Sequence, residues 1–348
     1  MYWSKYNIRS PVLLILGIFT FILAIQLMME GSTSFSFILD YKDGLGPVNT
    51  LGFGWLFSYL VLSGSPVAAS AITLLESGSI SEASTFMMIN GSRLGASFIV
   101  LGIGLLYMIR GRERKVSISI GLLAFIATAT IYTMGILIGY TILFYGLLDF
   151  LEISEVMVVG SVLDLIYVPI VAFLASYQQG ILLFGIGLLA LLASFKMIDM
   201  GMPRVNLDMI GKGRWKDGFY NKNVLFAIGS LVTLVTMSVS VSLSLLVPLS
   251  VRGQLKHEKS LPYIMGANIT TFADTLLVAV ILGSAVGVKI VLIEIISITI
   301  PTLIILMLLY SRYEALQLRL LKLFNSSLRA LGLFVGVIFL IPLMLFLI

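Results

Sequence analysis

Long apolar runs separated by short polar segments make up most of the chain. A helix needs roughly 20 apolar residues to cross the hydrocarbon core of a bilayer. Candidate spans cover residues 11–29, 51–75, 93–110, 116–135, 136–151, 156–177, 180–197, 223–247, 267–284, 286–310 and 330–348. Gly, Pro and Ser interrupt the spans at 51–75 and 223–247, and the span at 136–151 is short. The pattern predicts an all-α polytopic membrane protein in which some helices are broken.

One apolar run has the wrong period for a helix. The stretch TMSVSVSLSLLVPL carries serines at every second position, namely Ser238, Ser240, Ser242 and Ser244. Alternate positions on a helix are about 200° apart, so a helix cannot hold all four hydroxyls on one face. Unwound chain can, and at bilayer depth it is tolerated inside protein or beside a water-filled cavity. We therefore expect the chain to be unwound across these serines, although small residues that pack helices or bond to carbonyls one turn back would give the same sequence.

This run has a counterpart in the first half of the chain. The segment SGSPVAASAITLLESGSISEASTFMMINGSRLGAS aligns without a gap with SVSVSLSLLVPLSVRGQLKHEKSLPYIMGANITTF. At one constant offset, small and polar residues coincide at Gly54/Gly229, Ser63/Ser238, Ser65/Ser240, Gly78/Gly253 and Gly91/Gly266. Pro66 marks the first break, because proline removes a helical N–H. The alignment indicates two copies of one structural unit.

A second match, at a slightly shorter offset, gives the copies their direction. GIFTFILAIQLMMEG at 17–31 is similar to GLLALLASFKMIDMG at 187–201. The first segment ends at Glu30 before a loop with almost no Lys or Arg, whereas its copy ends before the basic loop at 204–222. Because basic loops stay in the cytoplasm, the copies run in opposite senses. Two inverted-topology repeats with broken helices or re-entrant hairpins are typical of secondary transporters, whose site lies near the midplane.

The repeats divide the chain into five parts. These are repeat 1 at 11–135 with its hairpin at about 51–91, connecting transmembrane helices at 136–179, repeat 2 at 180–310 with its hairpin at about 223–266, an interfacial amphipathic helix at 311–329 and a C-terminal transmembrane helix at 330–348. The amphipathic helix is inferred from SRYEALQLRLLKLFNSSLR, which carries Arg312, Arg319, Lys322 and Arg329 on one stripe. A solvated connector is the alternative.

Composition supports the membrane assignment. Hydrophobic residues make up 59% of the chain and charged residues 11%, and the mean hydropathy is +1.08. The net charge of +5 is spread over short clusters between the spans, so we interpret it as a topology signal and expect no nucleic-acid partner. The N-terminus and the basic loops are expected on the cytoplasmic side of the cell membrane. With no cysteine and one histidine, His257, the chain offers no disulfide, thiolate or histidine-cluster site, and we expect no cofactor.

The second copy resembles one known family. PLSVRGQLKHEKSLPYIMGANITT is similar to the second repeat of the type II sodium-dependent phosphate cotransporter family, which has a serine-rich break, a Pro-Leu, a Gly and a Gly-Ala-Asn-Ile-Gly-Thr-Thr element. GIFTFILAIQLMMEG also resembles that family's first helix. Leu62 and Met237 stand where the family's breaks carry glutamine, and Thr270 replaces a family glycine. The resemblance implies a divergent member with a substrate site between two hairpins and sodium beside it.

Several polar residues at the breaks are candidates for binding. Hydroxyls, freed amides and the Arg93 guanidinium fork suit an anion, so the expected substrate-binding residues are Ser63, Ser65, Arg93, Ser238, Ser240, Ser242, Asn268, Thr270 and Thr271. The expected cation-binding residues, whose oxygens suit sodium, are Asp274, Asn268, Thr271, Glu76 and Ser97. Arg93 equally well pairs with Glu76 or another buried carboxylate. Asp164 and Glu294 are further intramembrane carboxylates that either bind ions or bond to neighbouring helices.

The function expected from these features is sodium-coupled uptake of inorganic phosphate or a similar small anion by alternating access. The partners are the anion, sodium and the lipid bilayer, and a homodimer is compatible with the sequence. One alternative is a non-transporting membrane scaffold of the same fold. Another is an intramembrane lipid-phosphate enzyme that uses Arg93 and the carboxylates, although H-E-x-x-H, G-x-S-x-G and Walker-type motifs are absent from the sequence.

Overall fold

The computed structural model describes residues 9–32, 46–111, 114–150, 157–177, 180–201, 221–251 and 255–348. These residues are almost entirely helical and contain no strand. Seven helical segments among them are long and apolar enough to cross a membrane: Ser10–Ser32, Glu82–Ile109, Ile118–Phe144, Ile181–Gly201, Glu258–Ile281, Ala285–Phe324 and Leu328–Leu347. The protein is therefore an all-α, multi-pass membrane protein, as the hydrophobic pattern predicted.

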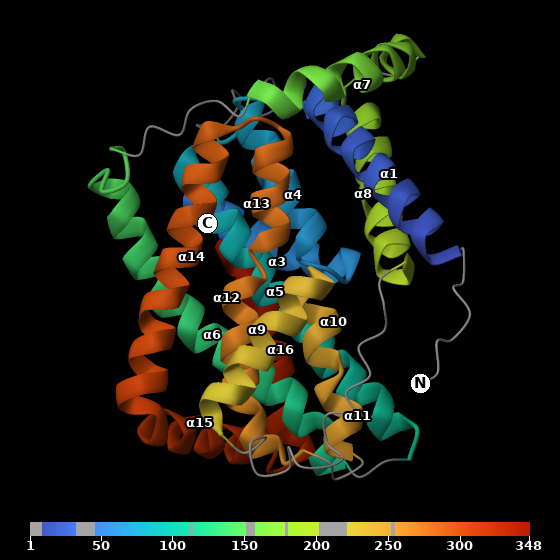
Figure 1. The fold of residues 1–348 in the computed structure, drawn as a ribbon. Coiled ribbons are helices and arrows are strands. Elements are labelled where there is room, and N and C mark those ends of the chain that lie inside the picture. The colour runs from blue at the N-terminus through green and yellow to red at the C-terminus, as the bar shows by residue number, and fades with distance from the viewer. Residues whose placement is uncertain are drawn as a thin grey trace.

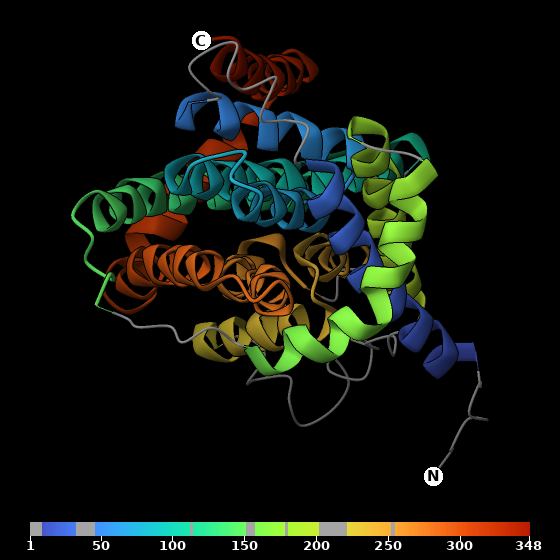
Figure 2. The ribbon, with the colours of Figure 1, turned by 90° about the horizontal axis from the view of Figure 1, so that it is seen from above.

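Seven described helices precede the basic loop at 204–222. They are α1 (Arg9–Ser32), α3 (Pro47–Val61), α4 (Ser65–Glu76), α5 (Glu82–Ile109), α6 (Arg114–Phe144), α7 (Met157–Tyr177) and α8 (Ile181–Gly201). In Figures 1 and 2, α1 and α8 form a tilted pair beside the main bundle, and α7 lies across its upper end. The pair is antiparallel, because Gly31 packs against Phe184 and Gly17 against Ile198.

The second half of the chain supplies the rest of the bundle. Its elements are α9 (Lys222–Thr236), α10 (Val239–Ser244), α11 (Leu246–Val251), the 3-10 helix η4 (His257–Ser260), α12 (Leu261–Thr270), α13 (Ala273–Ile281), α14 (Ala285–Ile304), the π-helical η5 (Ile305–Leu309), α15 (Tyr310–Phe324) and α16 (Leu328–Leu347). In Figure 1, α9 rises from the lower end to mid-height and α10 returns from there, so the two form a hairpin that does not cross the bundle.

Two left-handed residues terminate the leading helices of two hairpins. Leu62, with φ 51° and ψ 32°, follows α3, and Met237, with φ 48° and ψ 25°, follows α9. They are the only non-glycine residues with positive φ in the described parts of the chain, and they are related by the same offset as Ser63 and Ser238. The left-handed conformation is costly for a residue with a Cβ, so its recurrence at this offset is a specific correspondence between the two hairpins.

Helix contacts recur at the same offset. α3 begins at Pro47 and α9 at Lys222, which are equivalent positions in the aligned copies. A Cβ added to Gly54 would clash with the carbonyl oxygen of Met88, and one added to Gly229 would clash with that of Tyr263. Small residues let helix backbones approach closely in membranes. Gly54 and Gly229 are thus positions at which each leading helix touches the helix after its hairpin.

The predicted spans at 116–135 and 136–151 are one helix, α6, as far as Phe144. Gly135 and Gly139 lie where the two predicted spans meet, and both contact other helices: Gly135 lies against Ile298, and Gly139 against the ring of Phe86. Helix α7 lies across the upper end of the bundle, where the sequence predicted a connecting transmembrane helix. A helical glycine at a close contact has the same sequence signature as a helix break, so the pattern alone cannot separate them.

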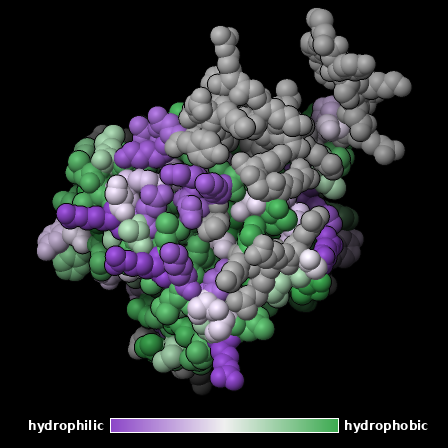
Figure 3. Space-filling model, turned by 90° about the horizontal axis from the view of Figure 1, so that it is seen from below, coloured by the Kyte–Doolittle hydropathy of each residue, from purple (hydrophilic) through white to green (hydrophobic). Residues whose placement is uncertain are grey.

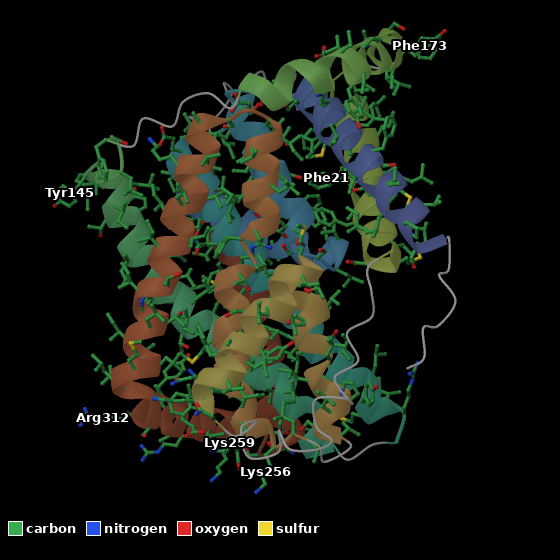
Figure 4. All side chains as sticks on the ribbon, viewed as in Figure 1. Phe21, Tyr145, Phe173, Lys256, Lys259 and Arg312 are labelled. Carbon is green, nitrogen blue, oxygen red and sulfur yellow. The ribbon has the colours of Figure 1, made fainter. Side chains whose placement is uncertain are left out.

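The lower end of the molecule is its basic face. Figure 3 shows hydrophilic side chains across this face from below, and Figure 4 places Lys256, Lys259 and Arg312 there. Helix α15 lies across the same end, with Tyr313 and Gln317 buried against the bundle. Most of the basic loop at 204–222 and the N-terminal residues up to 8 lie outside the described residues.

Candidate functional site

A cavity of about 410 Å³ lies where the two hairpin breaks meet α5 and α8. Its polar wall carries Ser63 from the first break and Ser238, Ser240 and Ser244 from the second. These four serines are partly buried. Three of the substrate-binding residues expected from the sequence, Ser63, Ser238 and Ser240, are therefore brought together here from the two hairpin breaks.

The second break is shorter than the sequence predicted. Only Met237 and Ser238 are non-helical, and the chain is α-helical from Val239 to Ser244, so the expected unwinding across all four serines is wrong. The left-handed Met237 reverses the chain. Ser238 is extended, and its Oγ accepts a hydrogen bond from the Val241 N–H at 3.3 Å. This N-cap starts a new helix immediately, because a serine side chain satisfies an amide that would otherwise lack a partner.

Helical geometry separates the serines of α10. Residues four positions apart share a helix face, so Ser240 and Ser244 both line the cavity. Ser242, two positions from each, is fully buried on the other face. Its hydroxyl lies 2.7 Å from that of Thr233 on α9 and 2.9 Å from that of Tyr263 on α12, so Ser242 joins α10 to these two helices instead of lining the cavity.

Helix α8 supplies the two charged side chains of the cavity, which the sequence reasoning did not identify. Lys196 and Asp199 are three positions apart and so lie on one face of the helix. Both are exposed, and neither forms a hydrogen bond or ion pair with another described residue. The available signal was a lysine and an aspartate at helical spacing at the end of an apolar run, which in membrane segments often marks a functional site.

The cavity lies between the breaks and the basic face. In Figure 1, α5 and α10 both descend from the level of the breaks toward the lower end, where Figure 4 places the labelled lysines. The residues that α5 contributes, Ile99 and Ile103, follow Arg93 in this direction. Helices α4 and α13 pack together above the breaks. The structure therefore has this cavity on the lower side of the breaks, while α4 and α13 pack together on the upper side, where a second cavity of about 400 Å³ lies between α1, α7 and the end of α13.

Arg93 is fully buried and forms an ion pair with Asp274. Its Nη2 lies 2.7 Å from Asp274 Oδ1 and 2.5 Å from Thr275 Oγ1, and its guanidinium lies 5.3 Å from the centre of the Phe272 ring. The sequence left two roles open for Arg93, binding of the substrate anion and pairing with a buried carboxylate, and in the structure Arg93 pairs with a carboxylate. The partner is Asp274 and not Glu76, which lies at the end of α4 and is exposed. Arg93 does not line the cavity.

The other candidate residues on α12 and just after it make internal contacts. Asn268 donates from Nδ2 to Thr128 Oγ1 at 3.0 Å, and Tyr132 donates to the Asn268 carbonyl at 3.1 Å. Thr270 donates to the Ser230 carbonyl at 2.9 Å. The Thr271 hydroxyl is buried without a hydrogen-bond partner in the described structure. The structure thus separates these residues, which hold α12 in the bundle, from the cavity serines.

The remaining candidates also lie in the interior. Ser65 is buried at the start of α4, and Ser97 donates to the Leu94 carbonyl at 2.6 Å. Glu294 of α14 is fully buried, and Asn90 Nδ2 donates to both of its carboxylate oxygens at 2.8 and 2.9 Å. The side chain of Asp164 lies outside the described residues. Within the described chain, no group of three or more His, Cys, Asp or Glu side chains is placed to hold a metal ion.

Comparisons of the chain with known protein families, with characterised proteins and with solved structures find no match. The functional interpretation therefore rests on the cavity, the hairpins and the charges around them.

Proposed function

We propose that the protein is a secondary active transporter that carries a small anion by alternating access. The observation that carries this proposal is that both hairpin breaks meet at one polar cavity. The left-handed residues, helix starts and glycine contacts that recur at one constant offset support two copies of one unit. In Figure 1 the second hairpin enters from the lower end, and α5 and α12 run in opposite directions. Paired interrupted helices at the centre of inverted repeats form the substrate site of many transporters.

The chemistry of the cavity favours an anion. Serine hydroxyls donate hydrogen bonds, and Lys196 supplies a positive charge that no described residue neutralises. Helix α4 starts at the first break, and its N-cap Gly64 provides no side-chain cap. The first amides of a helix lack acceptors within it and carry a partial positive charge, which attracts anions. By resemblance to the phosphate cotransporter family, inorganic phosphate is the first substrate to test.

Sodium is the proposed coupling ion, also by resemblance. Sodium prefers oxygen ligands, and Asp199 places a carboxylate in the same cavity as the serines. Asp274, the carboxylate expected from the sequence, is already neutralised by Arg93. Asp199 is therefore the better candidate, because a cation bound there would lie one helical turn from the anion at Lys196. Each ion would lower the electrostatic cost of binding the other.

The cavity also suggests which transport state is observed. Basic segments stay in the cytoplasm, so the lower face is assigned to the cytoplasmic side of the cell membrane. A cavity between the breaks and that face corresponds to an inward-facing state. In an outward-facing state, α4 and α13 would separate and the Arg93–Asp274 pair, which joins α5 to α13, would rearrange.

Uptake into proteoliposomes tests the proposal. Labelled phosphate is supplied with and without an inward sodium gradient to wild type, Ser240→Ala, Lys196→Gln and the control Lys256→Gln, whose lysine lies on the basic face. We expect sodium-dependent uptake that falls by about tenfold or more in the first two variants, since each loses a charged or polar contact to the anion, and is unchanged in the control. Absence of phosphate uptake under every gradient would overturn inorganic phosphate as the substrate. Uptake that both variants retain in full would overturn the site.

A further inference from the structure

More than half of the cavity wall is apolar. Besides the serines and the two charged residues, the wall is made by eight apolar residues, which include Leu62, Ile99, Ile103, Leu192, Phe195 and Val241. These residues come from both hairpins, α5 and α8, so the apolar surface runs along the cavity and is not confined to its rim. Inorganic phosphate would leave this surface in contact with water, which costs free energy in proportion to the apolar area.

Leu62 is the most informative residue of this wall. Its side chain is 65% exposed and lines the cavity, although it sits in the left-handed conformation that favours glycine or asparagine. A polar residue at this position would serve a small hydrated anion. An apolar side chain presented at the tip of the first break instead offers a contact for an apolar part of the ligand.

The cavity is also larger than a simple oxyanion needs. Its volume of about 410 Å³ compares with about 30 Å³ for one water molecule in the liquid. Cavities of about 300–1,000 Å³ are typical sites for small organic molecules. The wall presents hydroxyl and charged groups together with a larger apolar surface, so size and chemistry both indicate an amphiphilic ligand.

We propose that the substrate is a small organic anion, with its charged group at Ser63, Ser240 and Lys196 and its apolar body against Leu62, Ile99 and Phe195. This inference rests on the proposed function for the statement that the ligand is transported, and it names the substrate class of that site. Among organic anions, a monoester of phosphoric acid with a compact apolar group matches both the polar and the apolar residues of the wall.

Calorimetry on the protein in lipid nanodiscs tests this without requiring transport. The probes are phenyl phosphate, inorganic phosphate, benzyl alcohol and dodecyl phosphate. We expect phenyl phosphate to bind about tenfold or more tighter than inorganic phosphate, because burying even a small apolar group changes affinity by this order. Benzyl alcohol, which lacks the charge, should bind more weakly than phenyl phosphate. Dodecyl phosphate should bind no tighter than phenyl phosphate, since the cavity holds only a compact body.

Matched variants test which residues contact the apolar body of the ligand and which contact its charged group. Leu62→Gln should lower the preference for phenyl phosphate over inorganic phosphate about tenfold, as expected when a polar side chain replaces an apolar contact, while Leu62→Met keeps it. Lys196→Gln should weaken the binding of phenyl phosphate and leave the binding of benzyl alcohol unchanged. The elution profile and thermal unfolding are checked for every variant.

The inference is overturned, and anion transport is left standing, if inorganic phosphate binds as tightly as phenyl phosphate or if the preference for phenyl phosphate survives Leu62→Gln. Tighter binding of dodecyl phosphate overturns it in favour of a membrane lipid. Binding as predicted without flux of either phosphate overturns the transport proposal alone.

Discussion

The guanidinium of Arg93 on α5 and the carboxylate of Asp274 on α13 form an ion pair in the interior of the bundle, with 2.7 Å between Nη2 and Oδ1. Their side chains are 1% and 2% exposed. Each charge is therefore compensated by the other where water cannot compensate it. The pair links the helix that follows the first hairpin to the helix above the second.

Removing one partner of this pair should destabilise the protein strongly. Arg93→Met or Asp274→Leu is expected to lower the free energy of unfolding by about 3–5 kcal/mol, because each leaves an uncompensated buried charge. The double variant Arg93→Met/Asp274→Leu should recover most of that loss. Denaturant unfolding in detergent measures the three values.

A surface ion pair provides the control for this prediction. Lys289 lies 2.9 Å from Glu82 and 3.1 Å from Asp149 at partly exposed positions. Lys289→Met should cost no more than about 1 kcal/mol. If Arg93→Met costs as little as Lys289→Met, the buried pair does not form.

The glycine contacts of the two leading helices should be equally sensitive to a methyl group. Gly54→Ala and Gly229→Ala each place a Cβ against a backbone carbonyl and should destabilise by about 1–3 kcal/mol. Gly102→Ala on α5, where a Cβ meets nothing within 4 Å, should be neutral or stabilising. Thermal unfolding compares the three. Equal effects at all three sites would contradict the helix contacts described here.

The left-handed residues should tolerate glycine better than their neighbours do. Leu62→Gly relieves a conformational cost of about 1–2 kcal/mol, which offsets the roughly 0.5–1 kcal/mol that glycine loses in chain entropy. Leu60→Gly is the control, because Leu60 is likewise an exposed leucine, within α3, and its replacement should cost about 1 kcal/mol. Unfolding measurements in which Leu60→Gly is no less stable than Leu62→Gly would contradict the break at Leu62.

Two serines of α10 should separate stability from binding. Ser242→Ala removes the contacts to Thr233 and Tyr263 and should cost about 1–3 kcal/mol of stability with anion affinity unchanged. Ser240→Ala should weaken anion binding and leave stability nearly unchanged, because Ser240 has only a long contact of 3.4 Å to the Ala96 carbonyl. Calorimetry and thermal unfolding of both variants check this. The reverse pattern would mean that the cavity faces the other side of α10.

The sequence predicted an all-α membrane protein with helix breaks near Ser63 and Ser238, because both features depend on local pattern. The sequence alignment showed Gly54 opposite Gly229, because the close helix contact at each position admits little besides glycine. The sequence did not predict which face of α10 each serine occupies. It depends on how far the chain unwinds, and one N-cap bond at Ser238 decides that.

The rest of the candidate site could not be predicted from the sequence, because it depends on contacts between helices that are far apart in the chain. The partner of Arg93 lies far along the chain, and nothing local distinguishes Asp274 from Glu76 as the carboxylate that meets it. Lys196 gave a weak signal, because a lysine near the end of an apolar run is also typical of a helix that simply reaches the interface. Only the packing of α8 beside both hairpins places it at the cavity.

Alternating exposure of the cavity is the central claim, and single-cysteine labelling tests it most directly. The chain has no native cysteine, so Ser63→Cys or Ser240→Cys introduces a unique thiol, and Ser326→Cys at the exposed end of α15 is the control. In oriented proteoliposomes, a membrane-impermeant thiol reagent should reach positions 63 and 240 from either side, and bound anion should slow the reaction. Position 326 should react from the basic side alone. Reaction of positions 63 and 240 from one side only, with or without anion and sodium, would contradict the account.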